Sequence, residues 1–205
     1  MGQIFLSPIR TFLETVNNRS YRESVLQSLF PLINNNSRVL DLGCSDGNLA
    51  SELIKRNTTL QIVGVDVHIN PPARITAALY DGNRLPFPVS SFDMVMAVDV
   101  LHHVKDIRVV LEEMTRVSKQ YLLIKDHVWD GHVLSWLVLS FFDWCTNAPF
   151  GIPCAYNFPT MKRWKGYFNS FDLATKMTKQ VSHFPLKLNR KYNYVFLLEK
   201  VKRRG

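Results

Sequence analysis

Acidic side chains flank a glycine-rich turn in the first quarter of the chain. Residues 39–47 read Val-Leu-Asp-Leu-Gly-Cys-Ser-Asp-Gly, and a further acid, Asp66, follows 19 residues after Gly47 at the end of a second apolar run. Glycines let the backbone turn sharply and approach a ligand closely, and an acid about 20 residues later can bind a ribose hydroxyl. The pattern therefore predicts a nucleotide-binding site.

The residues of the turn indicate which nucleotide is bound. A dinucleotide site has three glycines as G-x-G-x-x-G and rests the pyrophosphate on a helix N-terminus. Here Ser45 occupies a glycine position, and Asp41 and Asp46 would lie near a pyrophosphate and repel it. S-adenosylmethionine carries an ammonium and a sulfonium but no phosphate, and it suits these acids better.

A second block of residues adds a family resemblance. Residues 81–88 read Asp-Gly-Asn-Arg-Leu-Pro-Phe-Pro, and residues 91–104 read Ser-Phe-Asp-Met-Val-Met-Ala-Val-Asp-Val-Leu-His-His-Val. With the glycine turn, and in this order, the blocks resemble the class I S-adenosylmethionine-dependent methyltransferases. The resemblance is specific over roughly residues 35–128. It is strongest to the broad small-molecule group, of the "methyltransferase type 11" kind, which includes quinone-biosynthesis enzymes.

The resemblance implies a set of cofactor contacts, with S-adenosylhomocysteine as the product. The turn would hold the methionine portion, Asp66 the ribose and Asp81 the adenine amine. Carried onto this sequence, the implied contacts are Asp41, Gly43, Cys44, Ser45, Gly47, Asp66, Val67, Asp81, Gly82, Asp99 and Val100.

The candidates for chemistry follow the fourth and fifth strands of the predicted sheet. Methyl transfer is an in-line displacement that depends mainly on positioning, and a base is needed only for a protonated acceptor. Ligands of open α/β sheets bind outside the carboxyl ends of the strands. His103 and His127 are therefore catalytic candidates, and His102 and Asp126 are substrate contacts. Helix capping and packing are the alternative roles of these four residues.

An apolar segment follows the fifth strand. Residues 133–142 contain no charge, residues 151–159 form an ordered-looking loop, and Tyr156 and Trp164 could line a wall for an apolar or aromatic acceptor. Plain core packing explains these residues equally well. Ten helical residues span about 15 Å, too short to cross a bilayer, so only peripheral membrane contact stays open.

The order of apolar runs predicts an α/β protein of the Rossmann-like methyltransferase type. We expect one domain over residues 1–205, with a mostly parallel sheet, helices on both faces and a C-terminal antiparallel hairpin. Its parts would be a helical cap (1–37), a cofactor-binding core (38–128), a lid or substrate region (129–170) and a basic hairpin (171–205). Only 14 residues separate Asp66 from Asp81, so the helix between the second and third strands is predicted to be missing.

Charge and composition limit the functional classes that remain. The chain has 205 residues and a net charge of +8, and residues 161–205 alone hold 12 Lys+Arg against 2 Asp+Glu. Such a block can meet RNA, anionic lipid or solvent, so an RNA-modifying methyltransferase and a non-catalytic cofactor-binding partner protein remain alternatives to the small-molecule enzyme. The three cysteines and the absence of a secretory pattern at the start predict a cytoplasmic protein. The spacing of His and Cys predicts no metal site, and the oligomeric state is undetermined.

Overall fold

A seven-stranded sheet forms the centre of the protein. The computed structural model describes residues 20–148, 154–181 and 192–201. The strand order is β3-β2-β1-β4-β5-β7-β6, and only β7 runs antiparallel to its neighbours. The strands are β1 (Arg38–Leu42), β2 (Gln61–Asp66), β3 (Ala77–Leu79), β4 (Phe92–Val98), β5 (Ser118–His127), β6 (Leu173–Gln180) and β7 (Asn193–Lys200). This is the predicted Rossmann-like methyltransferase fold with its C-terminal hairpin.

Helices cover both faces of the sheet because the central strands are apolar on both sides. On one face α2 (Ser20–Leu29) and α3 (Asn48–Arg56) pack on residues such as Val39, Met94 and Leu123. On the other face α4 (Ile107–Val117) and α6 (Met161–Ser170) pack on Leu40 and Leu122, among others. Two short 3-10 helices, η1 (Phe30–Leu32) and η2 (Leu101–His103), follow α2 and β4.

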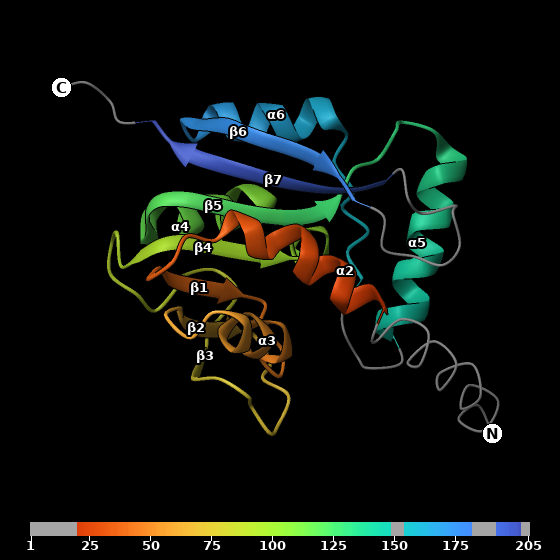
Figure 1. Ribbon diagram of the computed structural model, residues 1–205. Helices are drawn as coiled ribbons and strands as arrows, with labels where there is room; N and C mark the ends of the chain where they lie inside the picture. Colours follow the sequence, from red (N-terminus) through yellow and green to blue (C-terminus); the bar gives the residue numbers. More distant parts are fainter. Residues whose placement is uncertain (1–19, 149–153, 182–191, 202–205) are drawn as a thin grey trace, which may run out of the picture.

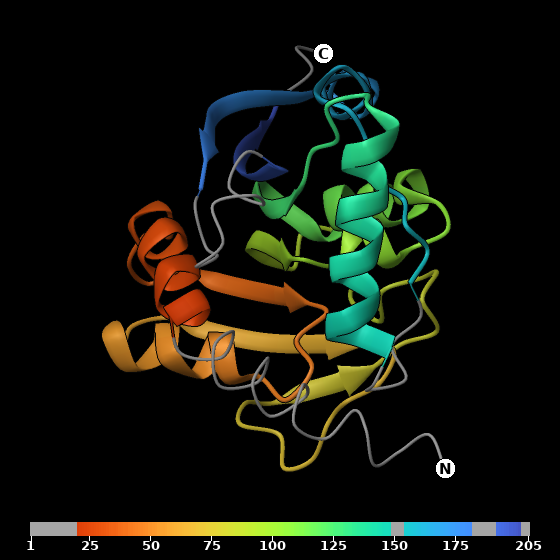
Figure 2. The same cartoon turned by 90° about the vertical axis from the view of Figure 1, so that its right-hand side faces the viewer.

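Helix α5 (Val133–Asn147) covers the edge where the parallel strands end. Figure 1 shows it upright beside the arrowheads of the strands, and the quarter turn in Figure 2 shows it crossing in front of them. Its inward face is buried, and its outward face exposes large apolar side chains, namely Val133, Leu134, Leu137, Phe141 and Trp144. No described helix is long and apolar enough to cross a membrane.

The connection from β2 to β3 contains no helix, as predicted. Ten residues, 67–76, link the two strands, and the parallel pairing that follows is only three residues long, with Val65 opposite Ala78. The backbone N–H of Arg74 donates to Asp46 O at the glycine turn, and β3 begins three residues later, at Ala77.

Other element predictions differ from the structure mainly in extent. Helix α5 continues five residues past the apolar run 133–142. Sequence reasoning did not predict α6, whose N-cap Thr160 accepts a hydrogen bond from the backbone of Arg163. The expected N-terminal helical cap is described only from Ser20 onward. Its first part and residues 151–153 of the predicted loop lie outside the described residues.

Candidate functional site

The glycine turn after β1 has a backbone that only glycine adopts without strain. Gly43 and Gly47 have φ of +78° and +73°. A Cβ on Gly43 would lie 2.3 Å from Val100 Cγ2, and one on Gly47 would lie 2.5 Å from Ile75 Cγ1. Ser45, which stands where a glycine was expected, also has a positive φ, +52°. The turn therefore keeps the tight, positive-φ backbone that the glycine pattern predicts.

Asp66 is fixed beside this turn by backbone donors. Its Oδ2 accepts a hydrogen bond from the Ser45 N–H at 2.8 Å, and its Oδ1 accepts one from the His68 N–H at 3.1 Å. Each carboxylate oxygen can accept a further bond. Asp66 thus fits the predicted role of a ribose-binding acid.

The helix-free link 67–76 is bound to the turn from outside. Arg74 donates through Nε to Asp46 Oδ2 at 3.1 Å and through its backbone N–H to Asp46 O at 2.8 Å, and Asn70 donates to Ser45 Oγ. This corrects the sequence argument that Asp46 would repel a pyrophosphate, because Asp46 is directed to Arg74.

Asp41 lies beneath the turn. It is almost fully buried, and burial together with the neighbouring Asp66 raises the pKa of its carboxyl to about 8. Cys44, an implied cofactor contact, directs its thiol at Gly64, where an added Cβ would lie 2.5 Å from Sγ. Burial and nearby acids raise the pKa of that thiol to about 12, so Cys44 stays a protonated packing group.

The adenine side is formed at the ends of β2 and β3. Asp81 Oδ1 accepts hydrogen bonds from the backbone of Asn83 and Arg84, and these bonds lower the pKa of the carboxyl. Gly82 has φ +82°, and a Cβ there would contact Val67, which is largely exposed. The three implied adenine contacts, Val67, Asp81 and Gly82, therefore lie together.

A buried lysine holds Asp99 at the end of β4. Lys125 Nζ lies 2.5 Å from Asp99 Oδ1, 2.8 Å from Asn193 Oδ1 and 3.0 Å from the Tyr21 hydroxyl, which itself donates to Asp99 Oδ2. Burial opposes ionisation of Asp99, but the Lys125 ammonium outweighs it and keeps the pKa of Asp99 below its usual value. Sequence reasoning missed Tyr21 and Asn193, because nothing in the sequence pairs helix α2 and strand β7 with β4.

The predicted histidines gather at the ends of β4 and β5. His102 Nδ1 lies 2.7 Å from Asp126 Oδ1, and the ring centroids of His102 and His127 are 4.8 Å apart. His102 and Asp126 are essentially buried, with side-chain exposures of 2% and 1%, whereas His103 and His127 are 17% and 15% exposed. Direct substrate contact, predicted for His102 and Asp126, does not fit this burial. The two residues instead support His103 and His127.

The charges in this cluster follow from burial and pairing. Burial alone would lower the pKa of His102, but Asp126 and Asp143 raise it to about 10. Burial lowers the pKa of His127, and its Nδ1 has no hydrogen-bond partner among the described residues. His127 is therefore a neutral imidazole that can accept a proton.

Helix α5 contributes an acid to the cluster. Asp143 Oδ1 lies 3.3 Å from His102 Nε2 and 3.7 Å from His103 Nε2. Nitrogen and oxygen atoms of these three residues, and separately of His102, Asp126 and His127, lie within 4.8 Å of one another, a spacing within reach of a metal ion. Sequence reasoning missed Asp143, although a lone acid within an apolar helix was an available signal.

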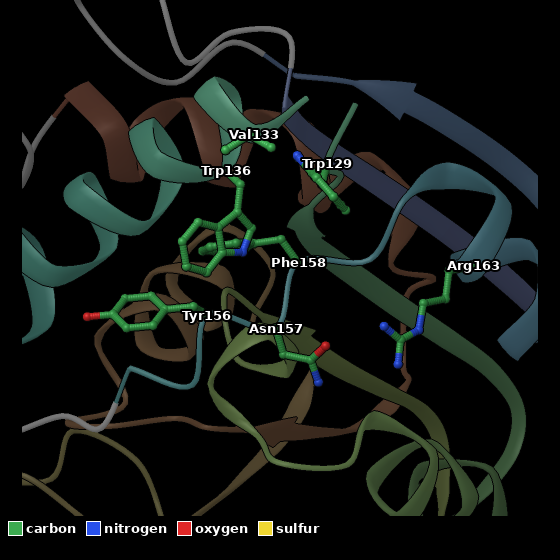
Figure 3. Close-up of a pocket in the computed structure, with 7 residues that line it drawn as sticks. All are labelled: Trp129, Val133, Trp136, Tyr156, Asn157, Phe158 and Arg163. Carbon is green, nitrogen blue, oxygen red and sulfur yellow. The ribbon is translucent and has the colours of Figure 1, made fainter. Parts of the chain in front are cut away.

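An aromatic cleft of about 310 Å³ adjoins the cluster (Figure 3). Phe158 forms the shared wall, with its ring 5.6 Å from the rings of both His102 and His127. Tyr156, a predicted substrate contact, lines the cleft, and Arg163 of α6 lies at its far end in Figure 3. The full lining is Trp129, Val133, Trp136, Tyr156, Asn157, Phe158 and Arg163.

Trp164 does not belong to this wall. It is fully buried against Phe168 and Phe196, and its indole N–H donates to His127 O at 3.0 Å. The predicted substrate contact is therefore wrong, because α6 turns this side chain into the core beneath β5 and β7.

Comparison with known proteins gives a consistent result. A family model described as a methyltransferase domain matches residues 13–174. The 27-O-demethylrifamycin SV methyltransferase of Amycolatopsis mediterranei is 29% identical over 95 residues, which cover 40% of this chain and 35% of that protein. An uncharacterized methyltransferase of Mycobacterium tuberculosis is 30% identical over 107 residues, which cover 48% and 52%. The chain thus spans about a third to a half of the length of these relatives.

A solved structure extends the comparison to the whole fold. The S-adenosylmethionine-dependent methyltransferase from Mesorhizobium loti superposes with a TM-score of 0.65 at 13% identity, covering 86% of this chain and 98% of that one. At this identity the likeness shows the fold alone.

Proposed function

Because this chain belongs to the class I S-adenosylmethionine-dependent methyltransferases, we propose that it methylates a small acceptor with an apolar or aromatic body. The observation that carries the acceptor class is the position of Phe158. Its ring packs against those of His102 and His127 and also lines a cleft with two tryptophans and a tyrosine. An aromatic acceptor in that cleft would therefore lie next to the histidine cluster, with the Phe158 ring between them.

The cofactor residues fit S-adenosylmethionine. Gly43 and Gly47 permit the positive-φ turn, Asp66 presents both carboxylate oxygens, and Asp41 provides a carboxyl for the ammonium. Asp81, Gly82 and Val67 would surround the adenine. When bound, the cofactor supplies an electrophilic methyl group on a sulfonium.

The charge balance beside the turn favours a cationic ligand. Asp99, Asp126 and Asp143 are carboxylates with lowered pKa values, and the cations among the groups paired with them are Lys125 and a protonated His102. These carboxylates would attract a sulfonium donor more strongly than an uncharged thioether product. This difference supports release of the product after transfer.

His127 and His103 would orient the acceptor and take its proton. His127 suits the role of base because burial lowers the pKa of its imidazole. Asp126 fixes the backbone of His127 by accepting its N–H at 2.6 Å. His103 is the other partly exposed imidazole of the cluster.

The RNA alternative has less support from the basic C-terminal segment. Lys200 Nζ is held by the carbonyls of Thr115 and Ser118 at 2.8 and 2.7 Å, and Lys176 pairs with Glu199 at 3.1 Å. These cations serve the fold. Binding of RNA that falls steeply with added salt would revive this alternative.

Mass spectrometry of the purified protein tests the proposal. Co-purified S-adenosylhomocysteine, or micromolar binding of S-adenosylmethionine by calorimetry, is expected, together with methylation of a panel of phenols and hydroxylated aromatics. His127→Gln should lower kcat at least 10-fold with little change in cofactor affinity, because a general base typically contributes 10²–10⁴-fold. His132→Gln, an exposed histidine before α5, is the control. No cofactor binding would refute the enzyme class, and equal activity of both variants would refute the role of His127.

A further inference from the structure

Three side chains from two elements form a group of metal-ligand type. His102 and His103 come from η2 and Asp143 from α5, and all three are at least four-fifths buried. Their donor atoms lie within 4.8 Å of one another. In the methyl-transfer roles proposed above, Asp143 contributes only its negative charge.

The tautomer of His102 requires a proton or a metal ion between His102 Nε2 and Asp143 Oδ1. His102 Nδ1 lies 2.7 Å from the Asp126 carboxylate, so this nitrogen carries a proton and donates it. In the neutral imidazole Nε2 then holds a lone pair, and it faces Asp143 Oδ1 at 3.3 Å. Two lone pairs repel at this distance. Either a second proton or a metal ion must lie between them.

The separations are compatible with a metal ion. A charge-assisted N–H···O bond measures about 2.7–2.9 Å, shorter than the 3.3 Å between His102 Nε2 and Asp143 Oδ1. The 3.7 Å between His103 Nε2 and the same oxygen is too long for any hydrogen bond. Ligands bound tetrahedrally at about 2.0–2.1 Å lie roughly 3.3–3.4 Å apart, so one ion accounts for the first distance and, with modest distortion, the second.

Hydrogen bonds to the ligands complete the pattern. Metal-bound histidines usually donate their other N–H to a carboxylate, as His102 does to Asp126. The Asp143 carboxylate is oriented in turn by Asn147 Nδ2, which donates to Oδ1 at 2.7 Å. We propose that His102, His103 and Asp143 bind a divalent cation of the Zn²⁺ class, with a fourth position left for water or a ligand oxygen.

With the ion bound, His103 would be a ligand and not a base, and the ion would activate the acceptor in its place. A three-ligand zinc with an open position polarises an oxygen and lowers the pKa of a bound hydroxyl. This role rests on the proposed methyl transfer, because the cleft meets the cluster at Phe158. Binding of the ion does not depend on methyl transfer, so the two proposals can fail separately.

Metal titration of the untagged full chain tests the site. After chelator treatment and dialysis, calorimetry with Zn²⁺ should show one equivalent bound, and Co²⁺ should give the visible absorption of a four-coordinate ion. Asp143→Asn and His103→Ala should each weaken binding at least 10-fold, and Asp126→Asn should weaken it 10–100-fold by releasing the His102 tautomer. His132→Ala and His68→Ala, two exposed histidines, are the matched controls and should bind normally.

Three results would overturn the proposal. The first is absence of a stoichiometric site in a protein whose circular dichroism shows it to be folded. The second is loss of binding in either control variant, which would mean adventitious surface binding. The third is an NMR spectrum in which His102 keeps both ring protons after Zn²⁺ addition, since the second proton would then be the only cation between His102 and Asp143.

Discussion

The buried carboxyl of Asp41 should make cofactor affinity depend on pH. In the free protein its pKa is raised to about 8, so the carboxyl is neutral at pH 7. If the cofactor ammonium binds Asp41, the carboxyl must ionise in the complex. Binding then releases a proton, and affinity rises with pH until about pH 8, above which the free carboxyl is already ionised.

The size of the effect follows from that pKa. The apparent Kd scales with 1 + 10^(8−pH), so it should fall about ninefold between pH 6 and pH 7, or about 1.3 kcal/mol, with about 0.9 proton released per binding event at pH 7. The pH range in which this relation can be measured ends below pH 7.7, because the α-amino group of the cofactor begins to lose its own proton there.

Calorimetry in buffers of different ionisation enthalpy measures both quantities. Asp41→Asn cannot ionise, so it should bind more weakly at pH 7 and show a flat pH dependence without proton release. An affinity of the wild type that does not change between pH 6 and pH 7, or an equal pH dependence in Asp41→Asn, would refute the placement of the ammonium at Asp41.

Three further substitutions test the turn, the ribose contact and the buried ion pair. Gly47→Ala should lower the free energy of unfolding by about 2–4 kcal/mol in urea titrations, because the new side chain would have a positive φ and would overlap Ile75 of the link 67–76. Gly166→Ala in α6 is the control. No atom lies within 4 Å of its new Cβ, so it should raise the free energy of unfolding by about 0.5–1 kcal/mol. Asp66→Ala should weaken cofactor binding about 10–100-fold in calorimetry, and unchanged affinity would mean that the ribose lies elsewhere. Lys125→Met should destabilise the protein by about 3–5 kcal/mol by leaving Asp99 buried without its cation, and the double variant with Asp99→Asn should recover part of the loss in the same titration; additive losses would contradict the pairing.

Local chemistry made the cofactor half of the site predictable. The apolar runs at β1, β2, β4 and β5 specify strands. Glycine at positions 43 and 47 predicts a tight turn, and both residues have the positive φ that such a turn requires. Parallel strands place their carboxyl ends at one edge, so the order of the motifs was sufficient to predict that Asp41, Asp66 and Asp99 meet there. The short link after Asp66 likewise excluded a helix by length alone.

Tertiary packing decided which residues form the acceptor side of the candidate site. Trp164 looked available to a substrate, and only the orientation of α6 shows that it fills the core. Asp143 lies 40 residues from His103 in sequence, and the crossing of α5 over the strand ends brings it to the histidines. Tyr21 and Asn193 join Lys125 across separations of 104 and 68 residues. Sequence periodicity encodes which face of an element is buried, but not which distant element covers it. The predicted cofactor contacts therefore follow from the sequence, whereas the partners of the histidines follow only from the fold.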